Sequence, residues 1–262
     1  MSSAVQVPPY PPGRNLLAGK NVLVTAAAGT GIGFATARRC LEEGARVYVS
    51  DLHERRLAEA VERLRAIEPD LVEGKLCDVT RETDVRALVA AAIAAMGRVD
   101  VLVNNAGLGG SAAVTEMTDE QWHKVLDVSL TSVFRMSRAM LPHMYANGCG
   151  AIVNNASVLG WRAQALQAHY AAAKAGVMAF TRCAAIEAAE HGVRINAVAP
   201  SIAMHAFLNK VTSDELLSDL KRREAFGRTA EVWEVANVIV FLASDLASYM
   251  TGEIVSVSSQ RA

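Results

Sequence analysis

Short apolar runs alternate with longer stretches of helical periodicity from Lys20 to the end of the chain. The runs are nearly continuous in apolar residues, as expected for parallel strands that are covered on both faces. Strands that alternate with helices in this way predict β-α-β units and one parallel sheet. Seven strands are expected, over Asn21–Thr25, Arg46–Asp51, Glu73–Asp78, Val101–Asn104, Ala151–Asn155, Arg194–Ala199 and Glu253–Val257.

Between these strands the periodicity predicts helices, among them Phe34–Glu43 and two long helices over residues 119–145 and 166–191. Long regular helices often pack against another subunit, although packing within one chain explains them equally well. The stretch 201–228, after the sixth strand, has no clear assignment. Because open α/β folds bind ligands beyond the carboxyl ends of their strands, we expect a substrate lid there, with an ordinary surface loop as the alternative.

Residues 1–17 contain four of the seven prolines and show no periodicity. This composition predicts a flexible, extended N-terminal tail, with a functional arm as the alternative. Residues 18–262 are expected to form a single doubly wound α/β domain, in which helices cover both faces of a central sheet. A chain of 262 residues, 52% of them hydrophobic, suffices for the core of such a domain.

Charge and cysteine usage narrow the classes of partner. The 26 basic and 27 acidic residues nearly cancel, so nucleic-acid binding is not expected and a small molecule is the predicted partner. The longest apolar run, Ala87–Met96, is too short to span a bilayer, and no signal peptide is recognisable, which predicts a cytoplasmic protein without a membrane partner. No metal site is expected. The four cysteines, which we expect to be reduced and packed, are Cys40, Cys77, Cys149 and Cys183.

A glycine-rich turn follows the first predicted strand, in the order Gly29-Thr30-Gly31-Ile32-Gly33, and a helix follows the turn. Glycines let the backbone approach a pyrophosphate, which the positive end of the helix dipole holds. Asp51 ends the second strand, 20 residues after Gly31, where a carboxylate accepts hydrogen bonds from the adenosine ribose hydroxyls. Helix capping explains the residue type of Asp51 but not its distance from the glycines.

A carboxylate at this position repels a 2′-phosphate, so the sequence favours NAD(H), with NADP(H) as the alternative. Arg55 and Arg56 follow Asp51 and partly offset its charge. Asp78, at the end of the third strand, is suited to hydrogen-bond the adenine amino group or to cap the following helix. Asn104 to Gly107 end the fourth strand with amide or small side chains, which leave room for a cofactor. Four consecutive strand ends therefore converge on one site.

Tyr170 and Lys174 stand four residues apart in a predicted helix and therefore share one helix face. A tyrosine, whose pKa in solution is near 10, needs a nearby cation to act as a base at neutral pH. Ser157 lies just after the fifth strand, where its hydroxyl can hold a carbonyl or alcohol oxygen while Tyr170 passes the proton.

In this order, the glycine turn, Asp51, the Asn-Asn-Ala-Gly segment, Ser157 and the Tyr-x-x-x-Lys pair resemble the short-chain dehydrogenase/reductase family from Lys20 to Val257. The resemblance implies a Rossmann-like fold and hydride transfer between a nicotinamide cofactor and a secondary alcohol or ketone. Tyr170 would be the general acid or base, Ser157 would polarise the reacting oxygen, and Lys174 would lower the pKa of Tyr170. The implied cofactor residues are Gly29, Gly31, Ile32, Gly33, Asp51, Asp78, Val79, Asn105, Ala106, Gly107, Tyr170, Lys174, Ile202 and Ala203.

Four departures from the family pattern are present. Alanine, Ala26 or Ala27, stands where the first glycine is expected, so the turn is predicted to take another path, using Gly29. Ser129 replaces an asparagine that helps a water relay protons to the lysine, and serine can still hold a water. His205 follows Pro200 near the place of a threonine that contacts the nicotinamide carboxamide; a solvated loop histidine is the alternative. The last strand runs into Gln260 without the common Asp-Gly-Gly turn.

The residues between Ser157 and Tyr170 predict a large, polar pocket wall, which contains Trp161, Arg162, Gln164, Gln167 and His169. Arg162 is suited to pair with a carboxylate or phosphate. Lys221, Arg222 and Arg223 in the lid suit an anionic tail such as coenzyme A, with a solvated helix face as the alternative.

The Ala-Ala-Ala-Gly-Thr-Gly-Ile-Gly turn and the Val-Ser-Ser-Gln terminus resemble an actinobacterial subgroup that acts on coenzyme A thioesters from steroid ring breakdown. A ring-bearing hydroxyacyl or ketoacyl thioester is therefore the leading substrate class. The alternatives are a 3-oxoacyl thioester, a general alcohol or sugar, and a non-catalytic NAD-binding scaffold. An enoyl reductase of this fold would need a wider tyrosine–lysine spacing, and an epimerase a longer C-terminal domain. A homo-oligomer, dimer or tetramer, is expected.

Overall fold

The computed structural model describes residues 5–204 and 214–260. Its centre is a parallel sheet of seven strands in the order β3-β2-β1-β4-β5-β6-β9. The first three strands extend from β1 toward one edge of the sheet. After β3 the chain crosses over to β4, which pairs with the other side of β1, so a topological switch point lies between β1 and β4. The strands are β1 (Asn21–Val24), β2 (Arg46–Asp51), β3 (Val72–Leu76), β4 (Val101–Asn104), β5 (Gly150–Asn155), β6 (Val193–Pro200) and β9 (Ile254–Val257).

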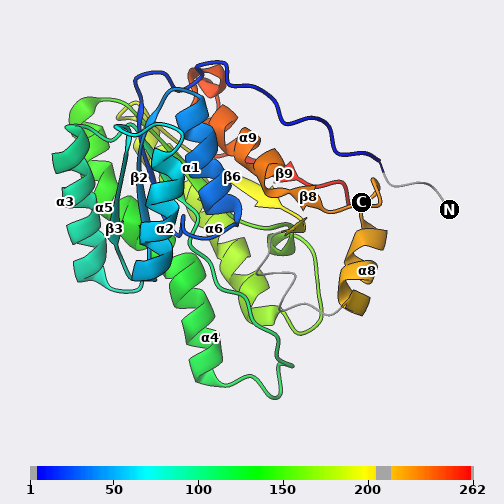
Figure 1. The fold of residues 1–262 in the computed structure, drawn as a ribbon. Coiled ribbons are helices and arrows are strands. Elements are labelled where there is room, and N and C mark those ends of the chain that lie inside the picture. The colour runs from blue at the N-terminus through cyan, green and yellow to red at the C-terminus, as the bar shows by residue number, and fades with distance from the viewer. Residues whose placement is uncertain (1–4, 205–213, 261–262) are drawn as a thin grey trace.

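Helices cover both faces of this sheet (Figure 1). One face packs against α1 (Ile32–Glu42), α2 (Glu54–Arg65) and α9 (Val232–Ala243). The other packs against α3 (Glu82–Met96), α5 (Ser132–Asn147) and α6 (Ala168–Ala189). In β1, Val22 and Val24 face the first layer and Leu23 faces the second, which is the alternation that a strand with two buried faces requires. The predicted doubly wound domain is confirmed.

The predicted strands match the observed ones to within two residues at each end, but the interpretation that every strand is covered on both faces is wrong for β3. Only Val72 of its five residues is buried. β3 lies at the edge of the sheet, where its alternate side chains reach solvent. β9 is the opposite edge strand and is likewise only partly covered.

The predicted helix over residues 119–145 is built from three consecutive elements, α4 (Asp119–Leu126), a π-helical turn (Asp127–Thr131) and α5. Thr118 and Gln121 form a capping box that fixes its start. Gly148, in the left-handed conformation, ends it. The π turn was not predicted, because apolar periodicity does not distinguish i→i+5 from i→i+4 bonding.

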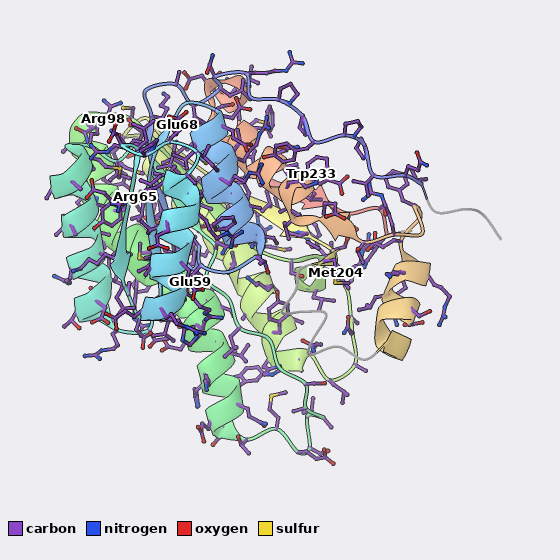
Figure 2. All side chains as sticks on the ribbon, in the orientation of Figure 1. Glu59, Arg65, Glu68, Arg98, Met204 and Trp233 are labelled. Carbon is purple, nitrogen blue, oxygen red and sulfur yellow. The ribbon has the colours of Figure 1, made fainter. Side chains whose placement is uncertain are left out.

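The N-terminal segment is partly anchored, whereas composition predicted a flexible tail. Residues 5–15 lack regular secondary structure, but Arg39 of α1 donates to the carbonyl oxygens of Pro11 and Pro12 at 2.6 and 3.1 Å. The buried Glu43 carboxylate accepts from the backbone of Arg14 at 2.8 Å. The ring of Tyr10 packs edge-on against Trp233 of α9, which Figure 2 labels. A proline-rich stretch is therefore held by polar contacts that its own composition does not show.

In the predicted lid, β7 (Ala203–Met204) pairs with β8 (Ala230–Glu231), which closes the base of the insertion. α8 (Asp214–Arg223) lies between them in sequence and stands apart from the helical layers in Figure 1. His205 lies outside the described residues. None of the helices in residues 5–204 and 214–260 has the length and apolar character to cross a membrane.

All four cysteines are free thiols, but the expectation that all are packed is wrong. Cys40 and Cys77 are buried, and burial raises the pKa of each thiol to about 12. Cys149 and Cys183 are exposed, because one lies in the turn before β5 and the other on the outer face of α6.

Candidate active site

The carboxyl ends of the strands meet at one edge of the sheet, and the predicted site residues lie along that edge. Figure 2 labels Arg98, which precedes β4, at the upper left, and Met204, which follows β6, near the middle of the molecule. A hollow of about 560 Å³ lies at the amino ends instead, among Lys20, Asp100 and Tyr249. No predicted site residue lines that hollow.

The start of α1 is suited to hold a phosphate group. Its N-cap is Gly31, no side chain caps the helix, and no acidic residue stands in the first turn. The first backbone N–H groups of a helix that lacks a capping side chain are directed at whatever lies beyond the helix end. Gly33 is needed for packing, since a Cβ atom there would lie 2.4 Å from both the Ala26 carbonyl oxygen and Asn105 Nδ2. These residues therefore fit the pyrophosphate of a dinucleotide.

Ala26, one of the two alanines that stand where the first glycine is expected, adopts the left-handed conformation, with φ +50°. The prediction that alanine would divert the turn is therefore wrong at this residue, although Gly29 does take a positive φ of +95° as expected. The Ala26 carbonyl accepts from Asn105 Nδ2 at 3.0 Å, and this contact holds the strained peptide in place. Such a conformation costs alanine on the order of 1 kcal/mol.

Asp51 connects the turn to the second strand. Its Oδ2 accepts from the backbone N–H of Ala28 at 3.2 Å, and its Oδ1 accepts from that of His53 at 3.0 Å. Burial raises the pKa of this carboxyl, while the Ala28 hydrogen bond and Arg56 act in the opposite direction. The Arg56 guanidinium lies 3.7 Å from Oδ1 and is 44% exposed, so its offset of the Asp51 charge is partial.

The next two strand ends carry the other predicted cofactor residues. Asp78 Oδ1 accepts from both the backbone and the hydroxyl of Thr80, at 2.9 and 2.7 Å, which supports a capping role before α3. Val79 is partly buried beside the second core cluster. Ala106 follows Asn105, and Thr25 Oγ1 accepts from the backbone of both at 3.2 and 3.0 Å. On the far side of the sheet, the carbonyl of Ile202 accepts from Ala230, and Ala203 is buried in β7.

Ser157, Tyr170 and Lys174 are brought together at the end of β5. Ser157 follows the strand, is 8% exposed, and its Oγ accepts from the backbone of Leu159 at 3.2 Å. Lys174 is 2% exposed, and its Nζ donates to the carbonyl oxygen of Asn155 at 2.6 Å. The same ammonium lies 5.6 Å from the centroid of the Tyr170 ring. The helical spacing of Tyr170 and Lys174 therefore directs both toward the strand that carries Ser157.

The two titratable groups of this cluster shift in opposite directions. Burial raises the pKa of Tyr170, and its hydrogen bond with Ser157 only partly opposes this. Burial lowers the pKa of Lys174 to about 8. Desolvation is the largest cause of both shifts, because it disfavours the charged form of each group, and a lowering of the Tyr170 pKa by Lys174 stays a prediction. Tyr170 is therefore protonated at neutral pH, which is the state that donates a proton.

Ser129 lies in the π-helical turn and is fully buried. Its Oγ donates to the carbonyl oxygen of Leu108 and accepts from the N–H of Leu108, both at 2.9 Å. Its one proton and one of its two lone pairs are used on the backbone of Leu108, so a water at the remaining lone pair stays a prediction. A Cβ on Gly107 would lie 3.4 Å from Lys174 Nζ and 3.9 Å from Ser129 Oγ, so the clamped segment passes directly beside the lysine.

Removing the Ser129 hydroxyl is expected to loosen this segment. Ser129→Ala leaves both backbone groups of Leu108 without a partner, which should destabilise the protein by about 1–3 kcal/mol. Ser132→Ala is the matched control, because Ser132 is also buried in this helix but bonds only to the carbonyl of Val128 within its own helix; a change within about 0.5 kcal/mol is expected there. Urea unfolding measures both, and equal losses would contradict the clamp.

Sequence reasoning missed a ladder of hydrogen-bonded amides at the ends of β4 and β5. Asn104 Nδ2 donates to Asn154 Oδ1 at 2.9 Å, and Asn155 Nδ2 donates to Asn105 Oδ1 at 2.9 Å. Because Asn155 also supplies the carbonyl that Lys174 contacts, the ladder connects the lysine to the cofactor turn. The doubled Asn-Asn pairs at two strand ends were the signal that could have revealed it.

Only some residues of the predicted pocket wall are exposed to solvent, and several of the polar ones are hydrogen-bonded to other segments. Trp161 is 51% exposed, and Arg162 donates to Gln260 Oε1 at 2.7 Å. Gln167 Nε2 donates to the Gly110 carbonyl oxygen at 2.6 Å. His169 does not face a pocket: it is 1% exposed, and a Cβ on Gly110 would lie 2.9 Å from its Nε2. The loop after β4 covers it.

Comparison with known proteins places this arrangement among characterised relatives. The sequence family described as Enoyl-(Acyl carrier protein) reductase matches residues 26–259. A (5R,7aS)-5-hydroxy-7a-methyl-1-oxo-2,3,5,6,7,7a-hexahydro-1H-indene-carboxyl-CoA reductase of Mycobacterium tuberculosis is 65% identical over 249 residues, 95% of each chain. A 3-oxoacyl-[acyl-carrier-protein] reductase of Thermotoga maritima is 37% identical and covers 92% of this chain and 97% of its own. The crystal structure of a short chain dehydrogenase from Mycobacterium smegmatis has a TM-score of 0.87 at 58% identity, covering 98% of this chain and 99% of that chain.

Proposed function

Because this chain belongs to the short-chain dehydrogenase/reductase family, we propose that it reduces a ring ketone carried on a coenzyme A thioester, with NADH as the preferred hydride donor. The observation that carries the proposal is the cluster at the end of β5, in which the part-buried Tyr170 lies beside Lys174 and close to Ser157. The substrate class is supported by the 65% identical relative, whose name describes a bicyclic ring with a carboxyl-CoA group.

Each residue of the cluster has a role that follows from its position. Ser157 donates a hydrogen bond to the ketone oxygen, and Tyr170 transfers its phenolic proton to the same oxygen as negative charge develops there. Lys174, fixed by the Asn155 carbonyl, stabilises the resulting phenolate. A bound nicotinamide supplies or accepts the hydride. The phosphates of that cofactor would lie at the start of α1, and its adenosine ribose at Asp51.

A substrate panel separates this proposal from its alternatives. Absorbance at the nicotinamide band is followed with a bicyclic keto-acyl-CoA, acetoacetyl-CoA, a 2-enoyl-CoA and a cyclohexanol carboxylate. The bicyclic ketone should give the highest kcat/KM. A preference for acetoacetyl-CoA would instead support a 3-oxoacyl thioester reductase, and oxidation of the cyclohexanol alone a general alcohol dehydrogenase. Turnover of only the enoyl ester would support the activity in the family description, which the three-residue spacing of Tyr170 and Lys174 argues against.

The cofactor preference is expected to depend on Asp51. The parent protein should bind NADH about 10-fold more tightly than NADPH, because the carboxylate repels a 2′-phosphate. Asp51→Ser should reduce this ratio, and Arg56→Ala should increase it, since Arg56 lies 3.7 Å from the carboxylate and partly offsets its charge. Fluorescence titration with both cofactors measures the ratio. Tighter binding of NADPH by the parent would overturn the assignment.

The same proposal includes a cytoplasmic homo-oligomer, a dimer or tetramer. Four free cysteines suit a reducing compartment. Phe134 of α5 and Ile186 of α6 are 42% and 74% exposed, and apolar side chains on the outer faces of these two helices suit a subunit contact. Light scattering coupled to size-exclusion chromatography measures the subunit number.

A further inference from the structure

The wall that follows Ser157 carries Arg162, whose partner among the described residues is neutral. Arg162 Nη1 donates to Gln260 Oε1 at 2.7 Å, and Gln260 is neutral. Among the side chains described in residues 5–204 and 218–260, no carboxylate lies at ion-pair distance from this guanidinium. An arginine has five N–H donors in a planar fork, so one hydrogen bond to an amide orients the guanidinium and leaves other N–H groups for a ligand.

The partner of Arg162 is held in turn by the end of α8. Gln260 forms an antiparallel bridge with Glu224, which directly follows α8. The backbone N–H of Ala225 donates to the Ser259 carbonyl oxygen at 2.6 Å, and Ser259 Oγ donates to Glu224 Oε2 at 2.7 Å. The segment after β9 therefore joins the pocket wall to α8, two parts of the chain about 60 residues apart in sequence.

The end of α8 adds further positive charge. Lys221, Arg222 and Arg223 are exposed in its last turn. Asp219 accepts hydrogen bonds from Arg222 and Arg223, which lower the pKa of its carboxyl. Glu224 is 4% exposed and is turned toward Ser259. Among the side chains described around the C-terminal segment, more are positive than negative, and neither Arg162 nor Lys221 forms an ion pair with another of them.

We propose that Arg162 and Lys221 form a site for the phosphate groups of the coenzyme A part of the substrate, with Gln260 as the residue that orients Arg162. This inference rests on the proposed function and adds the residues that recognise the carrier. Five positions separate Arg162 from Ser157, so their Cα atoms are at most about 18 Å apart. The long pantetheine arm bridges a separation of this kind, so the acyl ring lies at Tyr170 while the phosphates lie at Arg162.

The kinetic experiment compares the CoA thioester of one keto acid with the pantetheine thioester of the same acid, which lacks the phosphates. The measured quantity is kcat/KM for the CoA thioester divided by kcat/KM for the pantetheine thioester. Arg162→Gln should lower this ratio by about 10-fold, as expected for one charge-assisted contact. Lys221→Gln should lower it by about 3-fold. Gln260→Glu, which neutralises Arg162 in place, should act like Arg162→Gln. Arg86→Gln on α3, at the opposite side of the molecule in Figure 1, is the matched control and should leave the ratio unchanged.

A binding experiment tests the phosphate site even if the enzyme acts on a different acyl group from the one in these thioesters. Free coenzyme A is titrated by calorimetry in the presence of saturating NAD⁺, which occupies the dinucleotide site, and pantetheine serves as the phosphate-free probe. The parent should bind coenzyme A, and Arg162→Gln should weaken that binding about 10-fold. If the parent turns over neither thioester, the proposed function fails, while the coenzyme A titration still decides on the site. Equal effects of Arg162→Gln on both thioesters, or no weakening of coenzyme A binding, would overturn the phosphate site alone.

Discussion

Tyr170→Phe is expected to lower kcat/KM for ketone reduction by about 10³-fold while NADH affinity stays within about twofold of the parent. The variant retains the ring that lies near Lys174 but has no proton to transfer. Because burial raises the pKa of Tyr170, the parent phenol is protonated throughout the neutral range and acts as an acid there. Stopped-flow measurement of single turnovers with pre-bound NADH isolates the chemical step.

Tyr145→Phe is the matched control for this substitution. Tyr145 is stacked on His191 with ring centroids 4.0 Å apart, remote from the strand ends that carry the site. Its loss of a hydroxyl should leave both kcat and KM within about twofold of the parent. A Tyr170→Phe enzyme as fast as the parent would remove Tyr170 from the mechanism, and a parent without activity on any carbonyl would favour the NAD-binding scaffold.

Lys174→Met is expected to make the protein more stable and less active. Burial lowers the pKa of Lys174 from 10.5 to about 8, and the buried charge costs on the order of 3 kcal/mol of folding free energy at neutral pH. Loss of the hydrogen bond to the Asn155 carbonyl offsets about 1–2 kcal/mol of that gain. We therefore expect a net gain of about 1–2 kcal/mol at pH 7 and a fall in kcat of about 10²-fold.

The gain should depend on pH in a defined direction. Below pH 8, Lys174 is protonated in both the native and the unfolded state, so the parent bears the full cost of burial. Between about pH 8 and 10.5 the native state releases the proton and the unfolded state retains it, so the stability of the parent rises relative to that of the variant. Urea unfolding at a series of pH values measures this difference.

The control for the stability gain is Lys124→Met, which alters an exposed lysine of α4. Its effect should stay within about 0.5 kcal/mol and should not change with pH, because an exposed ammonium remains hydrated. Two results together would show that the cost attributed to the buried charge is wrong. Lys174→Met would be less stable than the parent at pH 7, and the difference in stability would be the same at every pH.

The local pattern of apolar residues was enough to locate the strands but not to predict which of their residues are buried. The apolar runs located all seven strands of the sheet, because burial of a strand requires apolar residues wherever the helices cover it. β3 differs from the covered strands in that its charged residues Glu73 and Lys75 signal partial exposure, and the interpretation of every run as continuously apolar overlooked them. The local pattern also did not separate exposed Cys149 from buried Cys77. Burial at a single residue depends on what packs across from it.

The sequence by itself determined that the chain forms a doubly wound α/β domain, that Tyr170 and Lys174 share one helix face and that Ser157 follows a strand end. Strand ends and a four-residue helical spacing are local properties, so they do not depend on distant contacts. Only the tertiary structure decided that Ala26 takes a left-handed conformation and that Ser129 clamps Leu108. It also decided that Arg162 meets Gln260, 98 positions away. Each of these depends on a hydrogen-bond partner from another segment, and a linear sequence does not specify which partner folding brings near.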